Sequence, residues 1–332
     1  MKRLIILLLI VALAGFGVWK YTKTDKYSTL GKDNDFAVKD TARISRIFLA
    51  DRKGNTASLT RKGKSWMVNN RYRVNDAVMG SFMNTIYGLE TQFRPPQAAI
   101  NTMVKNLAAQ SIKTEIYNDK NELIRSYYVG GVTPDESGTY MIMEGEEQPF
   151  IVGVKGKDGG IKVSYFTNEE NWRDKAVFRI GVDQIKSVEL EYPKLKNKSF
   201  KLVKTETGYE VSPLNTSVPK IAKPLNKSRV EAFLVGFKSQ VAEALYNNSS
   251  EKASIIQTLP FCIFNVEDVN GIKKNVKLYP LIKTNRDGRL ILDENGNPLP
   301  IEKYYAYVDD KDFFIVQEGL FGKIMWAYDY FF

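Results

Sequence analysis

One pattern of apolar residues occurs twice in this 332-residue chain, and it constrains the fold more than any other feature of the sequence. Three pairs share one offset of 141 positions: Ile44 with Ile185, Ile47 with Val188, and Leu49 with Leu190. In each copy this spacing is typical of a strand with one buried face. A turn and two further strands follow in both copies, and the third strand contains Trp66 in the first and Tyr209 in the second. The sequence therefore predicts two units of one architecture.

Each copy continues with a predicted amphipathic helix. The helix of the first copy is expected to be capped by Asn75 or Asp76, and it has an apolar stripe at Val78, Phe82, Ile86 and Leu89. In the second copy the stripe is longer and extends over residues 230–245. Ser228 and Glu231 form a capping-box pattern at its start.

A second, shorter helical segment follows in each copy, and in the first copy it begins at Pro95-Pro96. Strands and turns are predicted for the remainder of each copy. The order of three strands, two helices and four strands predicts an α+β fold, in which an antiparallel sheet has helices on one face. We expect two such repeats, over residues 36–180 and 181–332. An insertion in the second copy, from Lys283 to Lys303, is expected to protrude as a hairpin with a turn at Asn295-Gly296.

The N-terminal segment indicates where in the cell the protein is located. An uncharged apolar run from Leu4 to Trp19 predicts a membrane-anchor helix over residues 1–21, followed by a polar linker over residues 22–35. Its sixteen residues would rise about 24 Å, which is short of a hydrocarbon core of roughly 30 Å. Basic and aromatic flanking residues would therefore have to reach both interfaces. These flanking residues are Lys2, Arg3, Trp19 and Lys20.

A cleaved signal peptide is the alternative, because Ala12-Leu13-Ala14 has the small-x-small form of a cleavage site. We favour the anchor, since the released chain would begin with an apolar stretch that includes Phe16, Val18 and Trp19. The chain is then a single-pass protein of a bacterial inner membrane, with its bulk in the periplasm. The lone cysteine, Cys262, lies in an apolar run and is expected to be a core thiol.

Histidine is absent from the sequence. Its absence excludes Ser-His-Asp and Cys-His catalysis, histidine general bases and histidine-ligated metals, whereas a carboxylate pair remains open. Ser217 and Ser249 each precede a lysine by three positions, but the companion motifs of penicillin-binding enzymes are missing. We therefore expect no enzyme activity, no catalytic, cofactor-binding or metal-binding residues, and no cofactor.

The formal net charge is +10, and one basic stretch contains no acidic residue. It comprises Lys194, Lys196, Lys198, Lys201 and Lys204. A solvated hairpin tip and strand face is the simpler interpretation. The alternative is contact with an anionic surface, such as lipid headgroups or acidic polysaccharide. Nucleic acid is not an expected partner, because the chain is predicted to be exported and has no nucleic-acid motif.

The last segment, Leu320–Phe332, is rich in aromatic residues. We favour a terminal helix docked on the second sheet, because termini are often tied down in this way. The alternative is an exposed apolar patch for a partner.

Several short motifs resemble a bacterial envelope family that is catalogued as a domain of unknown function. They are the N-terminal anchor, Trp66-Met67-Val68, Gly138-Thr139-Tyr140, and the junction Trp172-Arg173-Asp174 followed by Val177-Phe178. Genes of this family often lie beside permease and auxiliary genes of ABC transporters of the gliding-motility type. The resemblance implies an accessory role in the envelope and provides no catalytic residues to transfer.

The leading hypothesis is a membrane-anchored periplasmic interaction module without catalytic activity, accessory to an ABC transporter whose subunits are its partners. The alternative is a protein that binds an envelope glycan or lipid, for which a cleft between the two copies would be the natural site. A carboxylate-dependent hydrolase ranks third.

Overall fold

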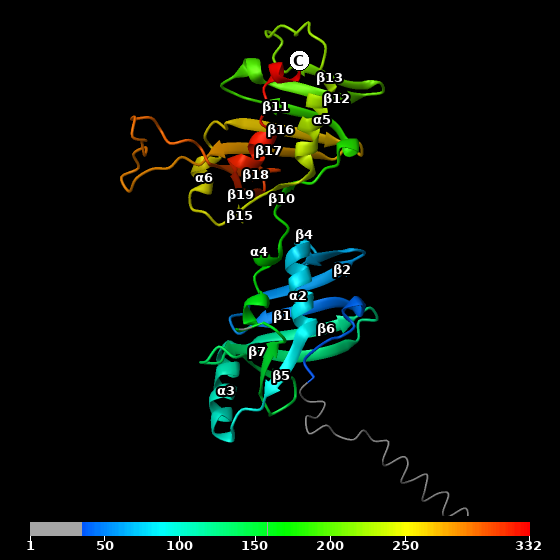
Figure 1. Ribbon diagram of the computed structural model, residues 1–332, viewed down its shortest axis with the longest axis vertical. Helices are drawn as coiled ribbons and strands as arrows, with labels where there is room; N and C mark the ends of the chain where they lie inside the picture. The colour runs from blue at the N-terminus through cyan, green and yellow to red at the C-terminus, as the bar shows by residue number, and fades with distance from the viewer. Residues whose placement is uncertain (1–34, 158) are drawn as a thin grey trace, which may run out of the picture. The chain divides into compact units, whose positions relative to one another are not determined.

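The computed structural model describes residues 35–157 and 159–332. The chain divides into two compact units, of which the first ends at Asp174 and the second begins at Lys175. Each unit is built around one large antiparallel sheet (Figure 1). The predicted anchor, and the predicted linker up to residue 34, lie outside the described residues.

The first unit contains a nine-stranded sheet in the order β4-β3-β2-β1-β6-β7-β8-β9-β5. Its strands are β1 (Ile44–Asp51), β2 (Thr56–Lys62), β3 (Ser65–Val68), β4 (Tyr72–Arg73), β5 (Leu89–Phe93), β6 (Ile112–Asn118), β7 (Leu123–Val132), β8 (Thr139–Met143) and β9 (Phe150–Val154). The α-helices described in this unit are α2 (Asp76–Gly88), α3 (Gln97–Gln110) and α4 (Glu169–Trp172).

The second unit contains an eight-stranded sheet in the order β13-β12-β11-β16-β17-β18-β19-β15. Its strands are β11 (Ile185–Glu191), β12 (Phe200–Thr205), β13 (Gly208–Pro213), β15 (Ala244–Leu245), β16 (Cys262–Asp268), β17 (Lys273–Pro280), β18 (Lys303–Val308) and β19 (Asp312–Gln317). A small separate pair joins β10 (Ala176–Phe178) to β14 (Gln240–Val241). The α-helices are α5 (Lys227–Val235), α6 (Lys252–Ile255) and α7 (Glu318–Phe321).

The two large sheets have the same strand order. Every strand of the second sheet has a counterpart at the same place in the first, and β4 is an additional edge strand. The registers agree as well. Trp66 lies opposite Arg61, which is two residues beyond Leu59, and Leu59 faces Ile47 on β1. Tyr209 lies opposite Lys204, which is two residues beyond Leu202, and Leu202 faces Val188 on β11. The two aromatic residues therefore occupy equivalent positions.

The predicted fold class, α+β after a membrane-anchor helix, is wrong. The described residues are mostly antiparallel strand with few helices, and none of their helices is long and apolar enough to cross a membrane. The error comes from reading strands as helix. The predicted helix over residues 230–245 ends at Val235, and both Val241 and Leu245 lie in short strands. An apolar run of this length fits both periods, so spacing alone cannot separate the two.

The helix starts differ between the units. In α2, the Asn75 side chain accepts hydrogen bonds from the backbone N–H groups of Ala77 and Val78, as predicted. In α5, Asn226 is the N-cap and accepts from the N–H of Arg229. The predicted capping box with Ser228 is therefore wrong, because Ser228 already lies inside the helix.

The core of the second unit is rich in phenylalanine. Phe200, Phe233 and Phe331 pack edge to face, with ring centroids 4.8 to 5.5 Å apart. Phe331 belongs to the C-terminal segment, which therefore docks on the core as favoured from the sequence. It does so through short turns rather than one helix: α7, then the 3-10 turns Gly322–Ile324 and Tyr328–Phe331. Cys262 is a fully buried residue of β16, and burial raises the pKa of its thiol well above the ordinary value.

Candidate interaction surfaces

The predicted group of five lysines is divided between a connection and a strand. Lys194 lies in the turn that follows β11, and Lys196 and Lys198 lie in a 3-10 turn before β12. All three are exposed. Lys201 and Lys204 belong to β12 itself. The predicted flanks of the anchor, Lys2, Arg3, Trp19 and Lys20, lie outside the described residues.

The two strand lysines are already engaged within the unit. The Lys201 Nζ atom lies 2.6 Å from Glu189 Oε1 on the neighbouring strand β11. Lys204 donates a hydrogen bond of 3.1 Å to the carbonyl oxygen of Asp183. In the part of the chain that the structure describes, no carboxylate lies within 4.0 Å of the other three lysines. Of these five lysines, all of them among the described residues, the three in the connection between β11 and β12 are therefore the ones paired with neither a carboxylate nor a carbonyl oxygen.

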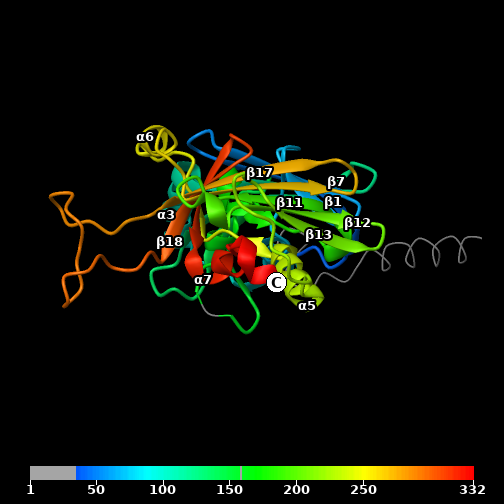
Figure 2. The same ribbon diagram turned by 90° about the horizontal axis from the view of Figure 1, so that it is seen from above.

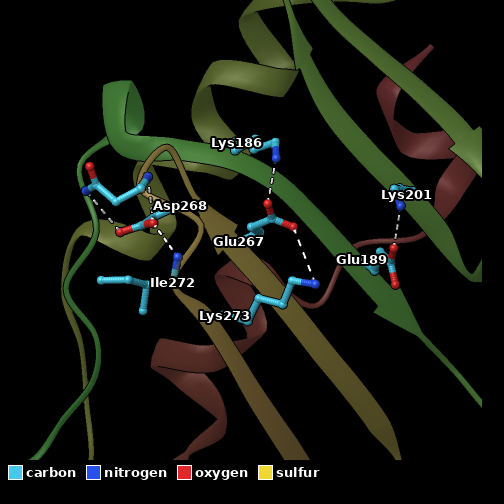
Figure 3. A network of polar contacts seen from close by, with 8 residues as sticks. Lys186, Glu189, Lys201, Glu267, Asp268, Ile272 and Lys273 are labelled. Atoms are coloured by element: carbon cyan, nitrogen blue, oxygen red, sulfur yellow. Dashed lines mark hydrogen bonds and ion pairs between the residues drawn. The ribbon is translucent and has the colours of Figure 1, made fainter.

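The solvent face of the second sheet has alternating charges (Figure 3). Lys186 Nζ lies 2.6 Å and Lys273 Nζ 4.0 Å from the carboxylate of Glu267. Together with Glu189 and Lys201, Glu267 and Lys273 line a shallow hollow of about 410 Å³. Exposed pairs of this kind each contribute about 0–1 kcal/mol to stability. The face is therefore charge-paired rather than basic.

Three acidic residues, Glu189, Glu267 and Asp309, thus line one hollow, and two acids in one pocket are the condition for the predicted third function. Glu189 and Glu267 each hold a lysine ammonium group at 2.6 Å, and Asp309 accepts a hydrogen bond from the backbone N–H of Asn275 at 2.8 Å. The hydrogen bond from Lys186 lowers the pKa of Glu267, although partial burial opposes this. A glycosidase needs one carboxyl group with a raised pKa to act as the general acid. The environment of Glu267 shifts its pKa in the opposite direction.

The insertion between β17 and β18 projects from the second unit (Figure 2). We call residues 282–302 the arm. The arm contains two successive turns where the sequence predicted one, and each is closed by a single bridge, Thr284 with Leu290 and Leu292 with Pro298. The second turn is the predicted one, and Gly296 adopts a φ of +82° there.

Asx hydrogen bonds brace both turns of the arm. The side chain of Asn285 accepts from the N–H groups of Asp287 and Arg289, at 3.0 and 2.9 Å. Asp293 accepts from Asn295 and Asn297 at 2.9 and 2.8 Å. The backbone hydrogen bond from Asn297 is the main cause of a lowered pKa at Asp293.

The arm exposes large apolar side chains. Leu290, Ile291 and Leu292 are consecutive and are 49%, 39% and 51% exposed. Ile282, at the base of the arm, is 54% exposed. The corresponding connection in the first unit, between β7 and β8, contains only residues 133–138. The arm is therefore specific to the second unit, and its exposed apolar run is of the kind found at binding surfaces.

The family described as "Domain of unknown function (DUF4340)" matches residues 87–258, which is over half of the chain. The chain belongs to this family. The predicted resemblance to a domain of unknown function is thereby confirmed at that level. No curated protein matches the chain.

The residues matched by this DUF4340 family extend across the boundary between the units at Asp174. They begin at the end of α2 and finish after α6, so the family is not defined by a single unit. The lysine connection before β12 lies inside the match, and the arm lies beyond it. The arm is thus outside the part of the chain that the family describes.

Aromatic residues on the outer face of β18 and β19 form a stacked cluster. The rings of Tyr305 and Phe313 are 5.2 Å apart and nearly parallel, and Tyr246 stacks beside both. Phe313 is fully buried. Because the rings cover one another, the cluster is a local core and offers little open ring surface to a ligand.

The second serine–lysine pair lies beside this cluster. Lys252 donates to the carbonyl oxygen of Lys311 at 3.0 Å, and Ser249 Oγ accepts from the N–H of Glu251. These contacts give both groups structural roles. Among the described residues there is no group of three or more Cys, Asp or Glu side chains arranged to hold a metal ion.

Sequence reasoning predicted the protrusion of the arm but missed its apolar surface. The signal was present, because Leu290-Ile291-Leu292 is an apolar triplet within an otherwise polar insertion. The pairing of Lys201 with Glu189 was also missed. That pairing depends on the cross-strand register of β11 and β12, which the run of lysines does not reveal.

Proposed function

We propose that the chain is a non-catalytic interaction module of a bacterial envelope, accessory to an ABC transporter and located at the periplasmic side of the inner membrane. The observation that carries the interaction role is the exposed apolar run on the arm. The envelope location and the transporter as partner are supported by the resemblance described above. The family itself is of unknown function.

The arm has two properties that suit a binding element. Burial of an exposed leucine or isoleucine contributes about 1.5–3 kcal/mol when it is complete, so covering these half-exposed residues contributes roughly 1 kcal/mol for each. In addition, Asn285 and Asp293 hold the turns in place, which reduces the entropy that is lost on binding. A partner that covers Leu290, Ile291 and Leu292 would thus gain affinity from a preformed surface.

The test is affinity purification of the tagged full-length chain from gently solubilised membranes of its source bacterium. We expect transporter subunits to copurify with the native chain. They should be lost when Leu290→Ser and Leu292→Ser are combined, since the apolar contact is removed. The matched control combines Arg286→Ser with Asp287→Ser on the same arm, which leaves the net charge and the apolar run unchanged.

A second comparison removes the arm altogether. Residues 282–302 are replaced by the short connection Thr133–Gly138 of the first unit, which joins the corresponding strands. Unchanged thermal unfolding would show that the unit still folds. The proposal is contradicted if transporter subunits copurify with this variant at native yield. It is also contradicted if they copurify with neither the native chain nor any variant.

An envelope glycan or lipid as ligand is the second candidate, and the three unpaired lysines of the β11–β12 connection favour it. We expect the full chain to cosediment with vesicles that contain anionic lipid, less so as salt increases. Changing Lys194, Lys196 and Lys198 to Gln should abolish the salt-sensitive part of this binding, whereas retention through the predicted anchor would not depend on salt. The control changes three exposed lysines of the first unit, Lys53, Lys62 and Lys64, to Gln. If both variants lose vesicle binding equally, net charge alone explains the binding, and a specific site is rejected.

A further inference from the structure

A separate hollow lies on the second unit, away from the arm. It has a volume of about 990 Å³ and is open to solvent on one side. Three segments form its walls: the end of α5 with the 3-10 turn Gly236–Lys238, the connection from β10 to Gln184, and the C-terminal segment from Leu320 to Trp326. Pockets of about 300–1,000 Å³ are typical of small-molecule sites.

The lining combines apolar surface with positive charge. Val235, Leu320 and Trp326 provide the apolar part, and Val235 is 54% exposed. Arg179, Lys238 and Lys323 provide the charge, and no acidic side chain is among the lining residues. In the described ranges, no carboxylate lies within 4.0 Å of either Lys238 or Lys323.

Two carbonyl groups of the 3-10 turn that follows α5, those of Gly236 and Phe237, already accept hydrogen bonds. The C-terminus of a helix has a partial negative charge on its free carbonyl groups, which would disfavour an anion. Here the carbonyl oxygen of Phe237 accepts from the N–H of Ile180 at 3.1 Å. The carbonyl oxygen of Gly236 accepts from the side-chain amide of Gln240 at 2.8 Å. These two carbonyl groups are therefore occupied.

The walls of the hollow are held by packing. The Trp326 ring lies 5.5 Å from Phe233 and 4.5 Å from Tyr330, between centroids. At Gly236, a Cβ atom would come within 2.4 Å of the Ile324 side chain, so the glycine permits the close approach of the C-terminal segment. The hollow is consequently a preformed feature of the unit.

From this geometry we propose that the hollow binds an amphipathic acid, meaning a single alkyl chain that ends in a phosphate or a carboxylate. Lys238 and Lys323 complement the acidic group, and Val235, Leu320 and Trp326 cover the first part of the alkyl chain. A concave site of this size suits a small amphiphile better than a protein partner, whose interface would be broad and flat. The proposal does not depend on the arm or on a transporter.

The test uses the full-length chain in amphipol and a decyl phosphate that carries a photoreactive diazirine on its alkyl chain. After irradiation, mass spectrometry should locate the label on the peptides that contain Val235 or Trp326. Unlabelled decyl phosphate should compete at least tenfold better than decyl maltoside, which has the same chain and a neutral head. Inorganic phosphate should compete poorly, because it lacks the alkyl chain.

The matched variants separate this site from general charge. Lys238→Gln combined with Lys323→Gln should reduce labelling at least fivefold, whereas Lys194→Gln with Lys196→Gln removes the same charge elsewhere on the unit and should leave it unchanged. Val235→Asn, a second variant, should weaken labelling through the apolar wall. The proposal is overturned by labelling outside the hollow only, by equal competition from decyl maltoside or inorganic phosphate, or by equal labelling of both lysine variants.

Discussion

The hydroxyl groups of Tyr127 and Tyr165 lie 3.2 Å apart in the core of the first unit and form a hydrogen bond there. Tyr127 lies on β7, and Tyr165 follows a 3-10 turn that is distant in sequence. Both side chains are almost completely buried. Among the described residues, each hydroxyl group has the other as its hydrogen-bond partner. The pair therefore joins the sheet to the segment that leads into the second unit.

We predict that Tyr165→Phe destabilises the protein by about 1–3 kcal/mol, because it leaves the Tyr127 hydroxyl buried without a partner. The double variant Tyr127→Phe, Tyr165→Phe should recover most of this loss, since both polar groups are then removed. Chemical denaturation of the two single variants and the double variant measures the coupling between the residues. Additive losses would contradict a specific hydrogen bond.

The same pair predicts sensitivity to alkaline conditions. Burial raises the pKa values of Tyr127 and Tyr165 above the ordinary value of 10.0. A phenol with a raised pKa in the folded state stabilises the fold below its unfolded pKa, and this contribution is lost as the pH rises. The free energy of unfolding should hence fall above about pH 10.

In the double phenylalanine variant this alkaline loss should be smaller. The control is Tyr87→Phe with Tyr330→Phe, because both of these tyrosines are 53% exposed. Unfolding curves recorded at several pH values between 8 and 11 provide the comparison. An identical pH dependence in the native chain and the core variant would count against the predicted linkage.

The duplication of the strands could be predicted from the sequence, because alternating apolar residues indicate which face of a strand is buried and they recur at a fixed offset. Ile47 and Val188 lie at the same place in their sheets, as their common offset predicted. The lengths of the helices could not be predicted equally well. Val241 and Leu245 continue the helical spacing of α5, but they pair as strands at positions that only the tertiary fold determines.

The candidate sites show a similar division. The exposed lysines of the β11–β12 connection are visible as a run in the sequence, and so is the arm. The hollow that contains Arg179, Lys238 and Trp326 is not visible, because its walls come from segments that are far apart in the chain. Such a site becomes apparent only when α5 and the C-terminal segment are packed together.

A third prediction concerns a charged group on the first sheet. Lys113 Nζ lies 2.8 Å from Glu115 and 2.7 Å from Glu144. The hydrogen bond from Lys113 is the main cause of a lowered pKa at Glu144. A carboxylate with a lowered pKa stabilises the fold above its ordinary value of 4.5, and this contribution is lost as the pH falls through the folded pKa.

Lys113→Met should therefore raise the pKa of Glu144, and NMR titration of the carboxylate measures the change. The effect on stability at pH 7 should stay below about 1 kcal/mol, because the Glu144 side chain is partly exposed and water screens the pair. Lys105→Met, which removes an exposed lysine from α3, is the control. An unchanged Glu144 titration in the Lys113 variant would contradict the assignment of Lys113 as the main cause.

The last prediction tests the contact between Gly236 and the C-terminal segment. A Cβ atom at Gly236 would come within 2.4 Å of Ile324 Cγ2, which is closer than real side chains approach. Gly236→Ala should therefore cost about 1–3 kcal/mol of unfolding free energy, as overpacking does in other cores. Combining it with Ile324→Ala should relieve the overlap, so the double variant should be less destabilised than the sum of the two single changes.

Gly319→Ala is the matched control, since a Cβ there meets no atom within 4 Å. It should be neutral or slightly stabilising because it lies in α7. Thermal and chemical unfolding of the four variants decide the question, and a Gly236→Ala protein as stable as the Gly319→Ala protein would show that the segment is free to shift.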